Sequence, residues 1–291
     1  MTASRSEFIT VRGLSIHVRH WGRVGAPQLF MLHGWMDVSA SFQFVVDALQ
    51  GDWHVIAPDW RGFGLSQRTA GDTYWFPDYV ADLDAILRHY SPDRAVFLLG
   101  HSMGANVAGV YAGARPERIR KFVNLEGAGM RSSTPEQAPG RYAAWLDGLD
   151  RPTRMRAYPN RQAVAARLQQ NNPRLSEQRA DFLSSHWAAL NDAGEWEILG
   201  DPLHKKSSPL LYHLDEVMAC WAAIKAPVLW VEAADTRIWQ WMGSKAEVRQ
   251  EIDRRLAFLP DLTVKTVADA GHMLHHDQPE LLARLVETFL A

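Results

Sequence analysis

The sequence predicts an α/β protein in which a mostly parallel central sheet is flanked by helices and interrupted by an inserted helical cap. Strand-like and helix-like runs alternate from the start of the chain to residue 126. The strand-like runs are apolar on both faces, which is typical of parallel strands covered by helices on either side. The alternation stops at residues 127–225 and then resumes. We therefore expect a core domain of residues 1–126 and 226–291 and a cap of residues 127–225.

The first part of the core opens with a hairpin and continues as alternating strands and helices. Two β-type runs, at residues 8–11 and 14–21, are joined around Gly13. The hydrophobic periodicity then predicts a strand at 28–32, a helix at 39–49, a strand at 53–57, a helix at 77–90, a strand at 95–99, a helix at 103–114 and a strand at 121–125. Because helices separate the strands, the sheet should be mostly parallel.

The cap region has a different pattern. Its helix-like runs are separated by proline and glycine, and none of its segments has the pattern of a buried strand. These runs span residues 134–149, 161–169, 176–191 and 214–224. The sheet pattern then resumes with strands at 227–232 and 262–267 and a closing helix at 278–290.

Composition excludes several classes of protein. The chain has 291 residues, of which 47% are hydrophobic and 22% are charged, so it can bury a core. Its net charge is -2, and Lys and Arg are spread along the chain, so we expect no nucleic acid partner. The single cysteine, Cys220, cannot form an intrachain disulfide and lacks the spacing of a zinc site.

Neither an export signal nor a membrane span is expected. Residues 1–10 are polar and run directly into a strand, without the apolar stretch of a signal peptide. Residues 95–114 contain no Asp, Glu, Lys or Arg, yet His101, Ser102 and Asn106 lie near the middle. This segment is therefore interpreted as a buried strand followed by a helix. We expect a cytoplasmic protein with no membrane partner.

The segment Gly100-His101-Ser102-Met103-Gly104 carries the strongest chemical signal. A serine hydroxyl is a weak nucleophile unless a base takes its proton, and it must be exposed to its substrate. A sharp turn from a strand into a helix lifts the serine off the sheet and requires small flanking residues, as Gly100 and Gly104 are. Ser102 is therefore the candidate nucleophile.

A second signal, His33-Gly34-Trp35-Met36, directly follows a predicted strand. Gly34 allows the backbone to pass close to a ligand, so the amides of Trp35 and Met103 could stabilise a carbonyl oxygen that becomes negative during attack. His33 is interpreted as a residue that holds this loop by hydrogen bonds, with metal ligation as the alternative.

The third signal lies between the last strand and the closing helix. A general base should sit on a loop at the carboxyl edge of the sheet, where His272 is expected. Its neighbours His275, His276 and Asp277 suggest a metal cluster, but no further ligands stand at ligand spacing. We interpret these neighbours as loop and helix-start residues, and we expect no metal and no cofactor.

Taken together, these motifs resemble the α/β-hydrolase superfamily. The resemblance rests on HGW, the segment DWRGFGLS at residues 59–66, GHSMG and AGHMLHHDQPE, and it covers residues 8–126 and 226–291. It implies Ser102 as nucleophile, His272 as base, the Trp35 and Met103 amides as oxyanion hole, and a lid over the pocket. It also implies a structural role for residues 59–66.

The acid that should orient the base is less clearly marked. The family usually places it just past the strand after the cap, often as Gly-x-x-Asp, and this chain has Glu232-Ala233-Ala234-Asp235 there, without the glycine. We expect Asp235 to be the acid. Some relatives carry it at the end of the preceding strand, where this chain has Glu126. Glu126 is the alternative acid, and a buried hydrogen-bonding role is its structural interpretation.

The expected activity is hydrolysis of a carboxylic ester or related acyl bond of a small apolar or aromatic substrate, without a cofactor. Serine at position 102 disfavours the branches of the family that attack with aspartate, the haloalkane dehalogenases and epoxide hydrolases. Carbon–carbon bond, lactone or amide hydrolysis, cofactor-free perhydrolysis and ligand binding with an idle triad stay open. We expect a pocket lined by Trp35, Met103, His101 and some of the other tryptophans near or in the cap, namely Trp145, Trp187, Trp196, Trp221, Trp239 and Trp241. The sequence does not specify the oligomeric state.

Overall fold

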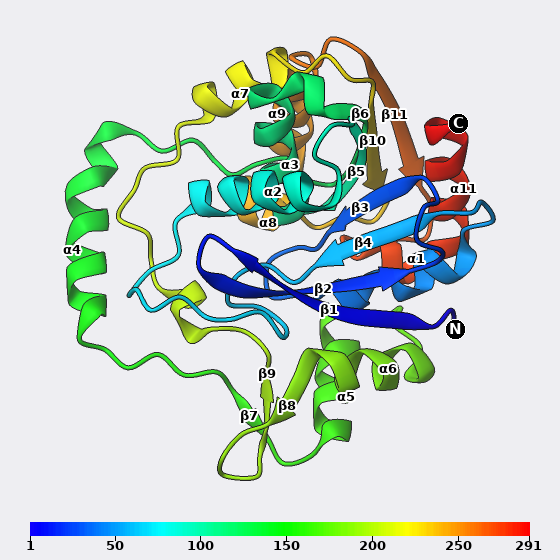
Figure 1. Ribbon diagram of the computed structural model, residues 1–291. Helices are drawn as coiled ribbons and strands as arrows, with labels where there is room; N and C mark the ends of the chain where they lie inside the picture. Colours follow the sequence, from blue (N-terminus) through cyan, green and yellow to red (C-terminus); the bar gives the residue numbers. More distant parts are fainter.

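The computed structural model describes residues 1–291, except for the side chain of Trp241. Its centre is an eight-stranded sheet with the strand order β1-β2-β4-β3-β5-β6-β10-β11 (Figure 1). The strands are β1 Ser4–Val11, β2 Leu14–Trp21, β3 Gln28–Leu32, β4 His54–Pro58, β5 Val96–His101, β6 Ile119–Leu125, β10 Val228–Ala233 and β11 Leu262–Val267. β1 and β2 form an antiparallel hairpin, β2 pairs antiparallel with β4, and the pairs from β4 to β11 are parallel. The predicted fold class is confirmed.

Helices cover both faces of the sheet because its central strands are apolar on both sides. One buried cluster joins the sheet to α2, α3, α7 and α9, and a second joins its other face to α1 and α11. The bounds of these helices are α1 Gln43–Ala48, α2 Phe76–Tyr90, α3 Met103–Ala114, α7 Leu214–Ala222, α9 Lys245–Leu256 and α11 Pro279–Leu290. Short helical turns connect them: η1 Ser39–Phe42, η2 Pro116–Arg118, α8 Trp239–Met242 and α10 Leu274–Asp277.

One long helix of the core, α9, is not predicted by the hydrophobic pattern of the sequence. Its sequence is strongly charged, so the hydrophobic pattern is weak, although Val248, Ile252 and Leu256 are buried at helical spacing. A capping box between Ser244 and Glu247 marks its start. That pair of residues is the signal that could have identified the helix.

Residues 127–225 do not form the purely helical cap that was expected. The segment contains η3 Pro135–Gln137, α4 Ala138–Leu149, α5 Arg161–Asn171, α6 Glu177–Trp187 and η4 Pro202–Lys205. It also contains a small antiparallel sheet, β7-β9-β8, built from β7 Ala157–Tyr158, β8 Ala188–Leu190 and β9 Trp196–Ile198. The helix predicted for residues 176–191 ends at Trp187 because Ala188 begins to pair with Ile198.

The last helix of that segment, α7, also differs from the expectation. It was assigned to the cap, yet Met218 and Trp221 are buried in the cluster that joins α3 to the sheet. The core packing therefore begins again at Leu214, before the expected boundary at residue 226.

The other elements of residues 127–225 differ in how closely they pack against the core. α5 and α6 lie beside the β1–β2 edge of the molecule, and Leu175, Ala180 and Leu183 pack against Phe44 (Figure 1). Near β9, Gly64 donates to the carbonyl of Leu199 at 2.8 Å and Asp201 donates to that of Gly62 at 2.7 Å. In contrast, α4 stands apart from the sheet in Figure 1, and none of its residues is buried. No helix in the described chain has both the length and the apolar character that a membrane span requires.

Candidate active site

Ser102 lies at the sharp turn between β5 and α3, as the motif predicts. Its backbone has φ 52° and ψ -116°, a strained conformation for a residue other than glycine. Two hydrogen bonds hold it: the Ser102 amide donates to the carbonyl of Leu125 at 2.9 Å, and the Asn106 amide donates to the carbonyl of Ser102 at 3.0 Å. The first bond joins the turn to the neighbouring strand β6.

Gly104 and Gly34 allow the backbone to pass closely around this turn. A Cβ at Gly104 would collide with the carbonyl oxygen of Leu32, at the end of β3. A Cβ at Gly34 would lie 3.2 Å from the Cβ of Ser102 and 2.9 Å from Nδ1 of His101. The loop after β3 therefore runs directly beside Ser102, which requires glycine at both positions.

The two amides expected to face a substrate oxygen lie on either side of this contact. Met103 is the first residue of α3, and the first amides of a helix have no intrahelical acceptor. Trp35 follows Gly34, and the residue is 53% exposed. The next residue, Met36, has φ 57°. This geometry could direct two backbone donors toward an oxygen atom near Ser102.

His33 holds the loop by hydrogen bonds, in agreement with the interpretation from the sequence. The amide of Trp60 donates to its Nε2 at 3.0 Å, so the proton is on Nδ1, which lies 2.7 Å from the carbonyl oxygen of Gly34. The indole of Trp60 donates to the carbonyl of His33 at 2.9 Å. Burial lowers the pKa of His33, which keeps it neutral.

The carboxylate that contacts His272 belongs to Glu126. His272 lies in the turn after β11, and its Nδ1 is 2.8 Å from Oε2 of Glu126. The Glu126 side chain is fully buried, and its backbone has φ 54° at the end of β6. A buried carboxylate needs hydrogen-bond donors, because it has lost its hydration. It receives them from the backbone amide of Ala233 and the hydroxyl of Thr236, each at 2.8 Å.

The expectation that Asp235 faces the base is therefore corrected. Asp235 is exposed, and its Oδ2 lies 2.6 Å from Nη2 of Arg174 in the loop between α5 and α6. The loop after β10 turns this carboxylate outward and directs Ala233 and Thr236 toward Glu126. Thr236 was not identified from the sequence, and we find no local signal for it.

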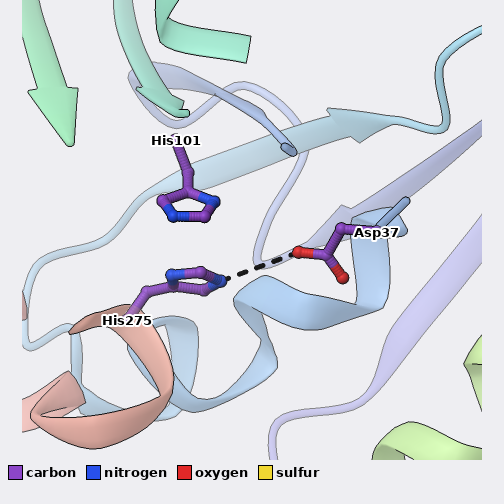
Figure 2. A group of neighbouring side chains, drawn as sticks. All are labelled: Asp37, His101 and His275. Atoms are coloured by element: carbon purple, nitrogen blue, oxygen red, sulfur yellow. Dashed lines mark ion pairs between the residues drawn. The ribbon is translucent and has the colours of Figure 1, made fainter. Parts of the chain in front are cut away.

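His101, which was expected to line the pocket, is buried beneath the turn. Only 2% of the residue is exposed, and its Nε2 lies 2.8 Å from the backbone carbonyl of His272. Its ring lies near the ring of His275 and the carboxylate of Asp37 (Figure 2). Burial lowers the pKa of His101 well below its ordinary value.

Asp277 and His276 supply no ligand atom to that group, although the ring of His276 lies 4.2 Å from that of His275. Asp277 accepts from the amide of Gly271 at 2.8 Å and from the side-chain amide of Asn172 at 2.7 Å, a loop-holding role. Nε2 of His276 lies 2.5 Å from the hydroxyl of Ser41.

The tryptophans expected around the site lie in different environments. The indole of Trp187, at the end of α6, donates to the carbonyl of Met36 at 2.7 Å, beside the exposed Trp35. Trp221 is buried in the core, and the side chain of Trp241 lies outside the described residues.

A hollow of about 530 Å³ lies away from Ser102, and it is lined by Gln137, Gly140, Arg141, Ala144, Ser207 and Ser208.

Comparison with known proteins identifies the family. A family model described as alpha/beta hydrolase fold matches residues 27–279. The chain belongs to the alpha/beta hydrolase fold family.

Similar curated proteins support a hydrolase. A serine hydrolase-like protein of Danio rerio is 27% identical over 287 residues, which cover 93% of this chain and 83% of that protein. A serine hydrolase-like protein of Dictyostelium discoideum is 23% identical, covering 96% of this chain and 79% of its own length.

Two solved structures show the same fold. The thioesterase domain from the curacin biosynthetic pathway has a TM-score of 0.86 at 23% identity and covers 98% of this chain and 99% of its own. E-2-(acetamidomethylene)succinate hydrolase has a TM-score of 0.76 at 21% identity, with 99% of each chain covered.

Proposed function

We propose that this protein is a serine hydrolase that cleaves a carboxylic ester or related acyl bond through a covalent acyl-enzyme. Ser102 is the nucleophile, His272 the general base and Glu126 the acid that orients the base. The hydrogen bond between Glu126 Oε2 and His272 Nδ1, at 2.8 Å beside the strained Ser102 turn, carries this proposal.

That hydrogen bond supports a specific tautomer of the base. A carboxylate only accepts hydrogen bonds, so the proton on a neutral His272 is on Nδ1 and the lone pair is on Nε2. Nε2 takes the hydroxyl proton of Ser102 as the serine oxygen attacks the carbonyl carbon. The imidazolium that forms is stabilised by the buried Glu126 carboxylate.

The remaining steps follow from the same groups. The amides of Trp35 and Met103 stabilise the negative oxygen of the tetrahedral intermediate. His272 then gives its proton to the leaving group, and Ser102 retains the acyl group. Water, deprotonated by His272, attacks this ester and releases the acid, which restores the serine hydroxyl.

The substrate side of the proposal rests on the aromatic residues beside the loop after β3. Trp35, with 53% of the residue exposed, follows Gly34, which passes close to Ser102, and the indole of Trp187 donates to the carbonyl of Met36. Apolar surface buried against such rings gains roughly 25 cal/mol per Å². We therefore propose a small substrate with a medium-length or aromatic acyl group. Because a thioesterase domain is among the structural neighbours, thioesters are added to the bonds to be tested.

A fluorophosphonate probe tests the nucleophile directly. The wild-type protein should be labelled on Ser102, as peptide mass spectrometry would show. Ser102→Ala should lose labelling and reduce kcat by about 10⁴-fold or more with its fold intact, whereas the exposed Ser132→Ala should behave as wild type. Labelling that persists in Ser102→Ala would refute the assignment. An unlabelled wild type that still binds ligands would indicate a binding protein with an idle triad.

The class of bond is decided by turnover on a panel of substrates. We expect kcat/KM to be higher for medium-length and aromatic p-nitrophenyl esters and thioesters than for acetyl or anionic ones. Preference for lactones, amides, peroxide-dependent substrates or vinylogous diketones would instead identify one of the other reactions of this site.

A further inference from the structure

Three side chains from distant segments of the chain converge beneath the Ser102 turn. Asp37 comes from the loop after β3, His101 from the end of β5 and His275 from α10. One ligand atom from each lies within 4.8 Å of the other two, and all three residues are buried. Figure 2 shows the carboxylate of Asp37 and the two imidazole rings facing a common space. Oδ2 of Asp37 and Nε2 of His275 are 3.8 Å apart.

The hydrogen bonds around His101 determine which of its nitrogens carries the proton. Nε2 faces the carbonyl oxygen of His272 at 2.8 Å, and a carbonyl can only accept. The proton of the neutral ring is therefore on Nε2, and Nδ1 presents a lone pair. A backbone carbonyl that holds the second nitrogen in this way is typical of metal-ligating histidines.

Two buried acceptors consequently face the shared space without a donor. Among the described residues, neither Nδ1 of His101 nor Oδ2 of Asp37 has a hydrogen-bond partner. Buried acceptors without a partner destabilise the fold, so a group that accepts electron pairs should lie between them. Nε2 of His275 is the third nitrogen or oxygen at this space, 3.1 Å from the hydroxyl of Ser41.

We propose that Asp37, His101 and His275 form a binding site for a divalent transition-metal ion of the zinc class. Two imidazole nitrogens and one carboxylate oxygen suit Zn²⁺, Co²⁺ or Ni²⁺ better than Mg²⁺ or Ca²⁺, which prefer oxygen ligands alone. Two ligands at about 2.1 Å from one ion lie at most about 4.2 Å apart. The three atoms all lie within 4.8 Å of one another, so small shifts of these side chains suffice to bring them to that spacing.

The position of this site gives it a structural role. His101 directly precedes Ser102, Asp37 lies in the same loop as Gly34, and His275 lies three positions after His272. An ion bound to all three would join the segments that carry the nucleophile, the backbone amides and the base. None of the three ligands needs to touch a substrate for this effect.

Metal binding is measured on the full chain after dialysis against a chelator. Calorimetry and elemental analysis should give one Zn²⁺ per chain, and Co²⁺ should produce the visible absorption of a low-symmetry nitrogen and oxygen site. At 100 times Kd the ion should stabilise the fold by about 2.7 kcal/mol, seen as a raised Tm. A wild type that takes up no stoichiometric ion would overturn the proposal and assign the space to a buried water.

Matched variants locate the ion. Asp37→Asn and His275→Asn should each weaken binding at least about 100-fold and abolish the rise in Tm. His213→Asn, at an exposed histidine, controls for adventitious surface binding, and His272→Asn controls for binding at the catalytic histidine. Both should retain one ion per chain. Loss of binding in His272→Asn, with retention in Asp37→Asn, would place the ion at the triad and contradict the proposal. Because His275→Asn could fail to fold, circular dichroism checks each variant, and Asp37→Asn preserves the side-chain shape.

Discussion

The turn around Ser102 and the helix α4 are held by the rest of the molecule to opposite degrees. At the carboxyl edge of the sheet, Ser102 and Glu126 have positive φ, and each is hydrogen-bonded to a neighbouring strand. In α4 no residue is buried, and the side chain of Leu146 is turned outward with 55% of the residue exposed. The groups proposed to react are therefore held in position by the sheet, whereas α4 has no buried residue that fixes it to the sheet.

The largest effect is expected when the proposed acid, Glu126, is replaced. Glu126→Gln should reduce kcat by about 10³- to 10⁴-fold, because the amide can no longer stabilise the imidazolium or select the tautomer of His272. Asp235→Asn should leave kcat within about twofold, since it removes only an exposed ion pair with Arg174. Steady-state kinetics on one ester would check both. The opposite ranking would return the role of the acid to Asp235.

A smaller effect is expected at Thr236, which positions Glu126. Thr236→Val removes one of the hydrogen bonds to the carboxylate and should lower kcat roughly 10- to 100-fold, the scale of a lost bond to a charged group. KM should not change, because Thr236 acts through Glu126. Thr236→Ser keeps the hydroxyl and should restore most of the activity. If valine and serine gave equal kcat, the hydroxyl would have no positioning role.

The junction between the core and the 127–225 segment should weaken in acid. His204 of η4 stacks between Phe63 and Tyr74, with ring centroids 3.8 Å and 3.7 Å away, and burial lowers its pKa to about 4. The unfolded chain binds a proton near pH 6.5 but the folded chain does not. Burial of the neutral His204 ring therefore contributes fully to the free energy of unfolding above pH 6.5, and this contribution is lost as the pH falls toward 4.

Denaturant unfolding at several pH values measures that loss. His204→Phe keeps the stacked ring without a proton site, so its free energy of unfolding should fall less steeply than that of the wild type below pH 6.5. The difference in slope is at most about 1.4 kcal/mol per pH unit for one group. His89→Gln, at an exposed histidine, should retain the wild-type slope. Equal slopes for wild type and His204→Phe would show that other buried histidines account for the acid sensitivity.

The smallest effect is expected in α4. Leu146→Ala should change the free energy of unfolding by less than about 0.5 kcal/mol, because Leu146 is exposed. Leu183→Ala, in α6 of the same segment, should cost about 2–5 kcal/mol, because Leu183 is 3% exposed and packs near Phe44. A large loss for Leu146→Ala would mean that α4 packs against another surface in solution.

Local pattern predicted the fold and part of the site, and contacts between distant strands account for the rest. The runs that became β3, β5 and α3 are continuous in sequence, so their periodicity and the glycines around Ser102 could be recognised directly. The pairing of Glu126 with His272 depends on the end of β6 lying beside β10, which no local pattern contains. The two- and three-residue strands β7, β8 and β9 are too short to show a period. Asp37 and His101 meet His275 only through the order of the strands.

With Glu126 as the proposed acid, the neighbouring ends of β6 and β10 offer two places in this fold for that carboxylate. The amide of Glu126 donates to the carbonyl of Val231 at 3.2 Å, so residues that follow either strand can reach the same point beside His272. A carboxylate could be gained on one strand before it is lost from the other, with the base oriented throughout. The lack of an aspartate that faces the base after β10 is therefore not by itself a sign that a chain of this fold has no triad acid, and a search for inactive members should inspect both strand ends.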